Sequence, residues 1–182
     1  MATEFESAGF GLGGTIGWTL GGLVGGFIAA AAFGLLMWLF DPDIVEAAIP
    51  AIYGFDPSTA LGMGLHLFHG AVLGLLFGFL VTRPAILGVL VGADRTETFS
   101  ETGLAARVIA AGFVFGLAVW AILPFVVMPV LVAAIGDPAA ENFPAIAVES
   151  LAGHVVFGLV LGIVFAVVVN LRERPFVDVL SD

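Results

Sequence analysis

Four long apolar stretches dominate the chain, and short segments rich in polar residues, proline and glycine separate them. The stretches cover roughly residues 15–40, 59–82, 104–128 and 145–170. A helix of about 20 apolar residues is long enough to cross the ~30 Å hydrocarbon layer of a bilayer. Arg107 and Glu149 are the only formally charged residues in these stretches, and each lies in the first turns of its segment. The pattern therefore predicts an all-α membrane protein with four transmembrane helices.

Proline and polar residues indicate how the connecting segments are built. Segment 42–54 is too short to span the bilayer and is expected to form a short helix in the outer interface. Asp56 followed by Pro57 predicts a side-chain cap with proline in the first turn of the second helix. Pro124 predicts a bend near the end of the third helix, because proline removes one backbone hydrogen bond.

The arginines lie on one side of the predicted topology. All five basic residues belong to the connection 83–107 or to the C-terminal tail: Arg83, Arg95, Arg107, Arg172 and Arg174. The connections 41–58 and 129–144 carry only acidic charges. Because arginine-rich loops stay in the cytoplasm, we expect a cytoplasmic-membrane protein with both termini and the middle connection inside. Residues 1–14 contain acids but no base, which is unlike a secretory signal peptide, so the first helix is expected to be retained.

Composition narrows the class of protein further. The chain of 182 residues is 60% hydrophobic and only 11% charged, which is too apolar for a soluble domain. Its net charge of −10 and its lack of lysine argue against binding to nucleic acid or to anionic headgroups. The same acid excess is similar to the surface chemistry of halophilic proteins. The absence of cysteine excludes disulfides, thiolate metal sites, iron–sulfur clusters and c-type haem attachment.

An internal duplication is visible in the second and fourth stretches. Residues 66–81 read HLFHGAVLGLLFGFLV and residues 154–169 read HVVFGLVLGIVFAVVV, with identical residues at seven of sixteen positions. We interpret 1–82 as a first two-helix repeat, 83–103 as a cytoplasmic connection, and 104–182 as a second repeat with a cytoplasmic tail. Since a two-span unit returns the chain to its starting side, the repeats are expected to be parallel. They would form a four-helix bundle with pseudo-twofold symmetry.

Glycine rows at a spacing of four residues predict how the helices pack. Glycine at this spacing lets two backbones approach closely within a membrane. The rows on helices two and four are expected to bring those two helices together. Helix one carries glycines on more than one face, which makes it the best candidate for a homo-oligomer interface. The residues expected in helix packing are Gly21, Gly25, Gly70, Gly74, Gly112, Gly116, Gly158 and Gly162.

Two histidines at matching positions of the repeats are the candidate chemical residues. Polar groups within a membrane usually face the interior of the bundle and mark functional sites. In one interpretation, His66 and His154 hydrogen-bond between helices and hold the repeats together. In a second, they are the axial ligands of a b-type haem. In a third, His66, His69, His154 and Glu149 form a metal site or a proton relay in a transporter.

Several short motifs resemble a known group of proteins. Ile49-Pro50-Ala51-Ile52-Tyr53-Gly54, His66-Leu67-Phe68-His69-Gly70 and Ser150-Leu151-Ala152-Gly153-His154 are similar to segments of uncharacterised four-span membrane proteins of halophilic archaea. The resemblance covers most of the chain and implies no established activity. Some members carry the label "histidine kinase", which this sequence does not support, because it has no cytoplasmic ATP-binding domain and its histidines lie in the apolar stretches.

These observations favour a protein that is not an enzyme. The chain has no P-loop, nucleophile elbow or zincin helix. The leading hypothesis is an accessory, scaffold or sensory subunit without a cofactor, embedded in the lipid bilayer as a homo-oligomer or as part of a larger membrane complex. A haem b electron-transfer protein and a small transporter remain the alternatives.

Overall fold

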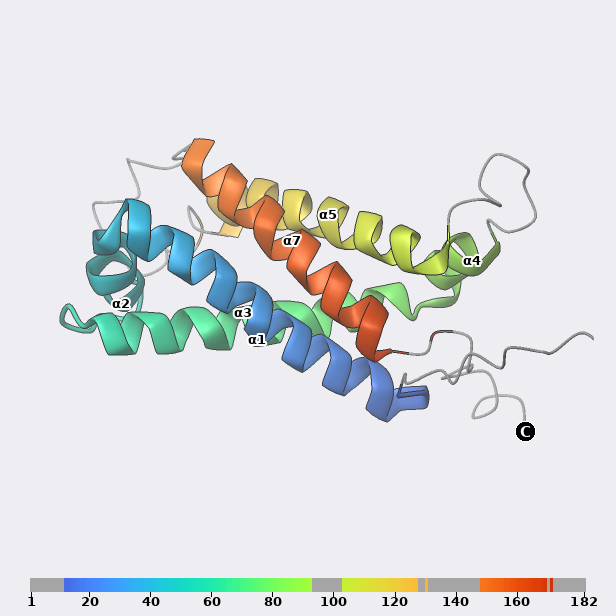
Figure 1. The fold of residues 1–182 in the computed structure, drawn as a ribbon. Helices are drawn as coiled ribbons and strands as arrows, with labels where there is room; N and C mark the ends of the chain where they lie inside the picture. Colours follow the sequence, from blue (N-terminus) through green and yellow to red (C-terminus); the bar gives the residue numbers. More distant parts are fainter. Residues whose placement is uncertain (1–11, 93–102, 128–129, 131–147, 170, 172–182) are drawn as a thin grey trace, which may run out of the picture.

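The computed structural model describes residues 12–92, 103–127, 130, 148–169 and 171 (Figure 1). Over these ranges the chain is almost entirely helical. The elements are α1 (Gly14–Phe40), the π-helical segment η1 (Ile44–Ala48), α2 (Ile49–Ala51), α3 (Thr59–Val81), α4 (Pro84–Gly92), α5 (Leu104–Ile122), the π-helical segment η3 (Leu123–Val127) and α7 (Val148–Val168).

Four of the helical runs are long and apolar enough to cross a membrane. They comprise Gly14–Phe40, Thr59–Val81, Leu104–Val127 and Ser150–Val168. Their bounds agree with the predicted stretches to within a few residues, since apolar length alone defines them. The all-α class and the four spans are thus confirmed, and the chain is a multi-pass membrane protein.

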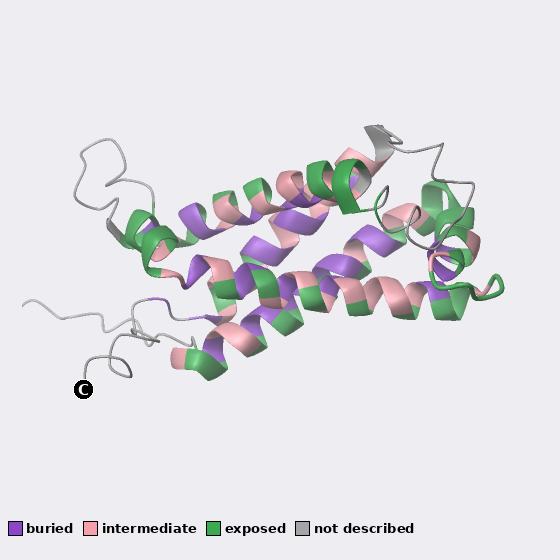
Figure 2. Ribbon diagram, turned by 180° about the vertical axis from the view of Figure 1, so that it is seen from behind, coloured by how far each residue is buried: buried purple, intermediate pink, exposed green. Residues whose placement is uncertain are grey.

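Helix α1 lies between α3 and α7, and α5 packs on the far side of α7 (Figure 1). Helices α3 and α5 approach each other much less closely than the other neighbours. One contact between them is aromatic, with the ring centroids of Phe77 and Phe115 5.4 Å apart. Buried residues line the surfaces where the helices meet, and exposed apolar residues cover the outside (Figure 2).

Glycines bring α1 and α3 into direct backbone contact. A Cβ atom on Gly26 would collide with the carbonyl oxygen of Gly70 and the Cα of Gly74. A Cβ on Gly74 would in turn collide with the carbonyl oxygen of Gly22. With hydrogen atoms in place of side chains, the two backbones gain van der Waals contact along this crossing.

A second glycine face of α1 packs against α7. The Cβ position of Gly21 is filled by the side chain of Val169, and that of Gly25 lies 3.1 Å from Leu161 Cδ1. Both glycines are buried. Both glycine faces of α1 are thus occupied by α3 and α7 of the same chain, so these glycines pack within the monomer.

The remaining glycines join α5 to α7. A Cβ on Gly112 would collide with the carbonyl oxygen of Gly158, and one on Gly116 with that of His154. Gly162 approaches Val108 and Ile109 of α5 in the same way. The expectation that the glycine rows of helices two and four face each other is wrong. Each row packs on the preceding long helix of its own hairpin.

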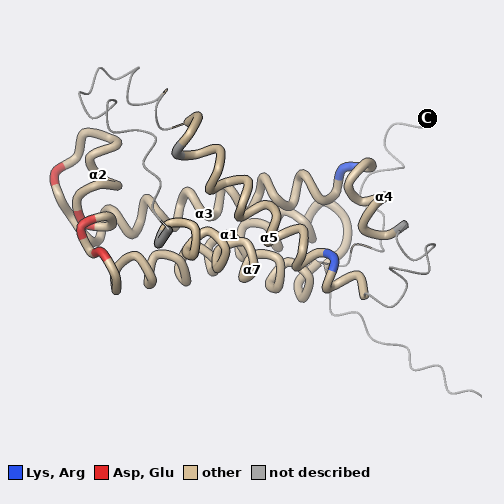
Figure 3. The backbone as a smooth tube through the Cα atoms, turned by 90° about the horizontal axis from the view of Figure 1, so that it is seen from above, with Lys and Arg blue, Asp and Glu red and all other residues tan. Residues whose placement is uncertain are grey.

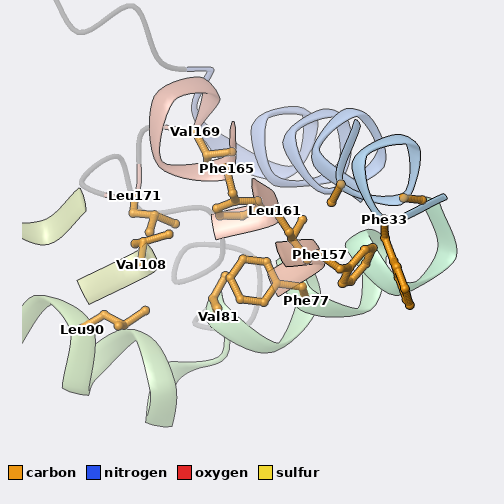
Figure 4. Close-up of a cluster of buried hydrophobic side chains, with 12 residues drawn as sticks. Phe33, Phe77, Val81, Leu90, Val108, Phe157, Leu161, Phe165, Val169 and Leu171 are labelled. Carbon is orange, nitrogen blue, oxygen red and sulfur yellow. The ribbon is translucent and has the colours of Figure 1, made fainter. Parts of the chain in front are cut away.

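Large aromatic side chains connect α3 with α7. Phe77 and Phe165 are almost completely buried and meet edge to face, with ring centroids 5.3 Å apart. Leu161 and Phe157 extend this core along α7 toward Phe33 of α1 (Figure 4). The contact between α3 and α7 is thus made by side chains, whereas glycines bring the backbones together at the α1–α3 and α5–α7 crossings.

The short connecting elements differ in detail from the prediction. Ser58, not Asp56, caps α3, and its Oγ accepts a hydrogen bond from the Leu61 backbone N–H at 3.3 Å. Helix α3 does not begin directly after Pro57, because the backbone at Ser58 is still extended (φ −162°). The expected short helix in 42–54 is present as η1 and α2.

Two prolines, Pro84 and Pro124, lie where one helical element gives way to the next. Helix α4 was not expected: Pro84 opens it in the first turn, where a missing N–H is harmless. At Pro124 the α5 helix passes into the π-helical segment η3. A wider turn of this kind accommodates a residue that has no backbone N–H to donate.

Opposite charges lie at opposite ends of the described bundle (Figure 3). Arg83 and Arg107 lie at the end that carries α4, which we call the α4 end. The acidic residues of the segment after α1 gather at the other end, the α2 end: Asp41, Asp43, Glu46 and Asp56. The separation agrees with the sequence-based division of the connections.

Candidate functional site

Phe33 forms the centre of the candidate site, with its ring seated on α7. The ring lies where a Cβ atom on Gly153 would be, so only glycine leaves room for it. Phe33 is buried, with 8% of its surface exposed. Phe33 precedes the end of α1 by two turns, and Gly153 lies in the second turn of α7, which puts the contact about 10 Å below the α2 end of the helices.

His66 reaches Phe33 from α3. Its ring meets the phenyl ring edge to face, with the centroids 5.3 Å apart. Its Nε2 lies 3.0 Å from the carbonyl oxygen of Ala30 on α1. Since a carbonyl oxygen only accepts, Nε2 must donate, which fixes the tautomer and leaves Nδ1 with its lone pair. This hydrogen bond joins two helices, as the first interpretation of the histidines expects.

His154 reaches the same phenyl ring from α7, with centroids 4.8 Å apart. Its Nδ1 lies 2.7 Å from the carbonyl oxygen of Ser150 and 3.4 Å from the Ser150 hydroxyl. The N–H of Nδ1 therefore donates within its own helix, and Nε2 keeps the lone pair. His66 and His154 thus meet through Phe33, and each has one nitrogen anchored by a backbone carbonyl.

Met63 completes the cluster one turn before His66. The Cβ position of Gly34, beside Phe33, lies 2.9 Å from Met63 Sδ and 3.0 Å from His66 Cδ2. The thioether and the imidazole therefore lie against the same glycine of α1. We call Phe33, Met63, His66 and His154 the Phe33 cluster.

His69 lies outside this cluster. Its Nε2 is hydrogen-bonded to the Tyr53 hydroxyl, and the two rings are stacked with centroids 5.7 Å apart. Phe68 borders the same imidazole. The side chain of Glu149 is outside the described residues. In the part of the chain that the structure describes, no three His, Asp or Glu side chains come together as metal ligands. The expected set of His66, His69, His154 and Glu149 is not assembled there.

The haem alternative does not fit the arrangement of these residues. A b-type haem held by His66 and His154 needs a flat space between the two imidazoles. Here both imidazoles contact the ring of Phe33, and that ring is fixed on Gly153. The glycine rows of α3 and α7 lie at the α1–α3 and α5–α7 crossings, so they do not make room for a macrocycle between the two imidazoles.

Sequence reasoning missed Phe33, Met63 and Gly153. Phe33 is one of 17 phenylalanines, and Gly153 falls outside the glycine rows at spacing four. The available signal was Gly153 directly before the histidine of α7, because a glycine in a span allows a neighbouring helix to approach closely.

The comparisons with known proteins add no family: no family model, curated protein or solved structure matches the chain. The class rests on the fold alone, which is that of a four-span helical membrane protein.

Proposed function

We propose that the chain is a non-catalytic subunit of a cytoplasmic-membrane assembly, with an accessory, scaffold or sensory role. One observation supports this best. Polar side chains in the described spans and at their ends bond to nearby backbone carbonyls: His66 to Ala30, His154 to Ser150, and Thr82, at the end of α3, to Gly78 at 2.9 Å. Such bonds use polar groups to hold the helices. The Ser150 hydroxyl lies 3.4 Å from Nδ1 of His154, but that nitrogen donates its N–H to the Ser150 carbonyl and therefore has no lone pair with which to activate the hydroxyl as a nucleophile.

The repeat is part of this proposal. Gly26 of α1 fits between Gly70 and Gly74 of α3, and Gly112 of α5 fits between Gly158 and Gly162 of α7 in the same register. The similarity favours two copies of one hairpin, related by a pseudo-twofold axis along the membrane normal. The relation is incomplete, since α1 packs closely on α7 whereas α3 and α5 are joined mainly by larger side chains.

A native complex tests the subunit role. Solubilised in a mild detergent from its own membranes, the chain should migrate at several times its mass of 18.7 kDa together with a stoichiometric partner. The same preparation should show no Soret band. A monodisperse, partner-free chain, or a haem spectrum, would refute the proposal. A homo-oligomer alone would replace the subunit role with a self-assembling one.

The proposed orientation places both termini and the 83–103 connection in the cytoplasm. It rests on the arginines at the α4 end and the acids at the α2 end (Figure 3). We expect a single cysteine introduced at Asp56, in the connection before α3, to react with a membrane-impermeant maleimide in intact cells. A cysteine at Thr96, in the middle connection, should react only after lysis. The reverse pattern would invert the topology.

A further inference from the structure

Tyr53 and His69 form a hydrogen-bonded pair beside α3, outside the Phe33 cluster. Tyr53 is the one tyrosine of the chain. Its hydroxyl meets Nε2 of His69, and the two rings are stacked with 27° between their planes. A phenol is a better donor than acceptor, whereas the bare nitrogen of a neutral imidazole is a good acceptor. The Tyr53 O–H therefore donates to Nε2, which places the N–H of His69 on Nδ1.

Neighbouring elements hold the two rings in this geometry. Tyr53 follows α2, and its side chain reaches His69 about three turns into α3. Phe55 stacks on Tyr53 with ring centroids 6.5 Å apart, and Phe68 borders His69 at 6.2 Å. Tyr53 leaves 48% of its surface exposed, whereas His69 is half-buried. A molecule outside the bundle can therefore reach the phenol ring while the imidazole stays fixed behind its hydroxyl.

This arrangement suits the loss of one electron from the phenol. A phenol that loses an electron but keeps its proton becomes a cation radical, which is far higher in energy than the neutral phenoxyl radical. A base in hydrogen-bond contact lowers this barrier by accepting the proton. We propose that the Tyr53–His69 pair is a proton-coupled electron donor for one-electron oxidants that reach the exposed side of the Tyr53 ring.

The proposed step is balanced within the pair and its oxidant. One electron passes from Tyr53 to the oxidant, the phenolic O–H bond breaks, and an N–H bond forms at Nε2 of His69. The products are the reduced oxidant, a neutral Tyr53 radical and an imidazolium ion. An electron returned to Tyr53 brings the same proton back. The proposal is independent of the proposed subunit role.

The other titratable groups around the pair do not take the place of His69. His66 lies one turn earlier on α3 and is hydrogen-bonded to α1. Glu46 of η1 accepts a hydrogen bond from the Thr59 hydroxyl at 3.3 Å. Helices α1, α2 and α5 bring no charged side chain to this part of α3. The other described acids of the α2 end are exposed: Asp41, Asp43 and Asp56.

Flash photo-oxidation of the purified full-length protein in detergent tests the pair. The oxidant is tris(bipyridine)ruthenium(III), generated by a light flash in the presence of persulfate. The phenoxyl radical is followed by its absorbance and its electron paramagnetic resonance, and Tyr53→Phe should abolish both signals. We expect radical formation to be slow in mild acid, where protonated His69 has no lone pair at Nε2. The rate should rise to a plateau once His69 is neutral.

Variants of His69 separate its action as a base from a structural role. His69→Gln keeps a hydrogen-bond acceptor but is not a base. It should lower the plateau rate about tenfold or more and remove the rise with pH, since a positioned general base typically contributes about 10²–10⁴-fold. His69→Ala should regain rate in proportion to added imidazole. Phe68→Leu should keep the wild-type profile, because Phe68 borders the imidazole without bonding to it.

Three results would each overturn the proposal. The first is an equal rate of radical formation in the wild type and in His69→Gln. The second is a wild-type rate that does not change between mild acid and neutral pH. The third is the absence of a phenoxyl signal from the wild type.

Discussion

Gly26→Ala should unfold or strongly destabilise the protein, although it adds a single methyl group. The new Cβ would collide with backbone atoms of Gly70 and Gly74, and backbone cannot turn aside as a flexible side chain can. Overpacking of this kind costs about 1–3 kcal/mol in well-packed cores, and the expected loss is at the upper end of that range. Thermal unfolding in detergent, followed by circular dichroism, measures it.

Gly64→Ala on α3 is the matched control. Nothing lies within 4 Å of the Cβ position of Gly64, and the residue is exposed on the outside of the bundle. Because alanine favours helix over glycine by about 1 kcal/mol, this variant should be as stable as the wild type or slightly more so. Equal melting temperatures for Gly26→Ala and Gly64→Ala would contradict the α1–α3 crossing described above.

The second large effect concerns Phe33 and Gly153. Gly153→Ala should be strongly destabilising, because the ring of Phe33 occupies the position of the new methyl group. Phe33→Ala should also cost about 3–5 kcal/mol, the usual loss for a buried phenylalanine in a core. In the double variant the ring that collides with the methyl group is gone. The two losses should therefore fall well short of adding.

A double-mutant cycle measures that coupling, in which contacting residues typically show about 0.5–3 kcal/mol of interaction energy. Phe77→Ala combined with Gly153→Ala serves as the control pair, since no contact joins Phe77 to Gly153. Strict additivity for Phe33 and Gly153, at the level of the control pair, would show that the ring does not sit on α7.

Sequence patterns predicted where the helices lie along the chain better than which helices pack against one another. Four apolar runs of sufficient length define four spans whatever their packing, so their bounds could be read from hydropathy. Glycine periodicity identified the close-packing faces of α3, α5 and α7. It could not say which helix each face meets, because the same row fits any glycine-rich partner. The rows of α3 and α7 were therefore assigned to each other, whereas α1 and α5 are the actual partners.

The candidate site was predicted in part for a similar reason. His66 and His154 stood out because polar residues are rare in the spans. The contact of both histidines with Phe33 could not be predicted. It depends on the angle at which α1 crosses α7 and on the space that Gly153 leaves for the Phe33 ring. His69 was grouped with them by its spacing from His66. In the structure, His69 is hydrogen-bonded to Tyr53, which lies in the connection between α2 and α3.

The close packing of α1 on α7 has a consequence for biosynthesis. Helix α1 leaves the ribosome well before α7. The segment before α1 is also joined to the end of α7, through the hydrogen bond from the Leu12 N–H to the Val168 carbonyl at 2.8 Å. The α1–α3 hairpin can assemble early, but the face of α1 that carries Gly21 and Gly25 stays open to lipid until α7 has been made. A stalled or truncated nascent chain would therefore display an unfilled glycine surface, which marks it as incomplete to any membrane quality-control protease that recognises such surfaces.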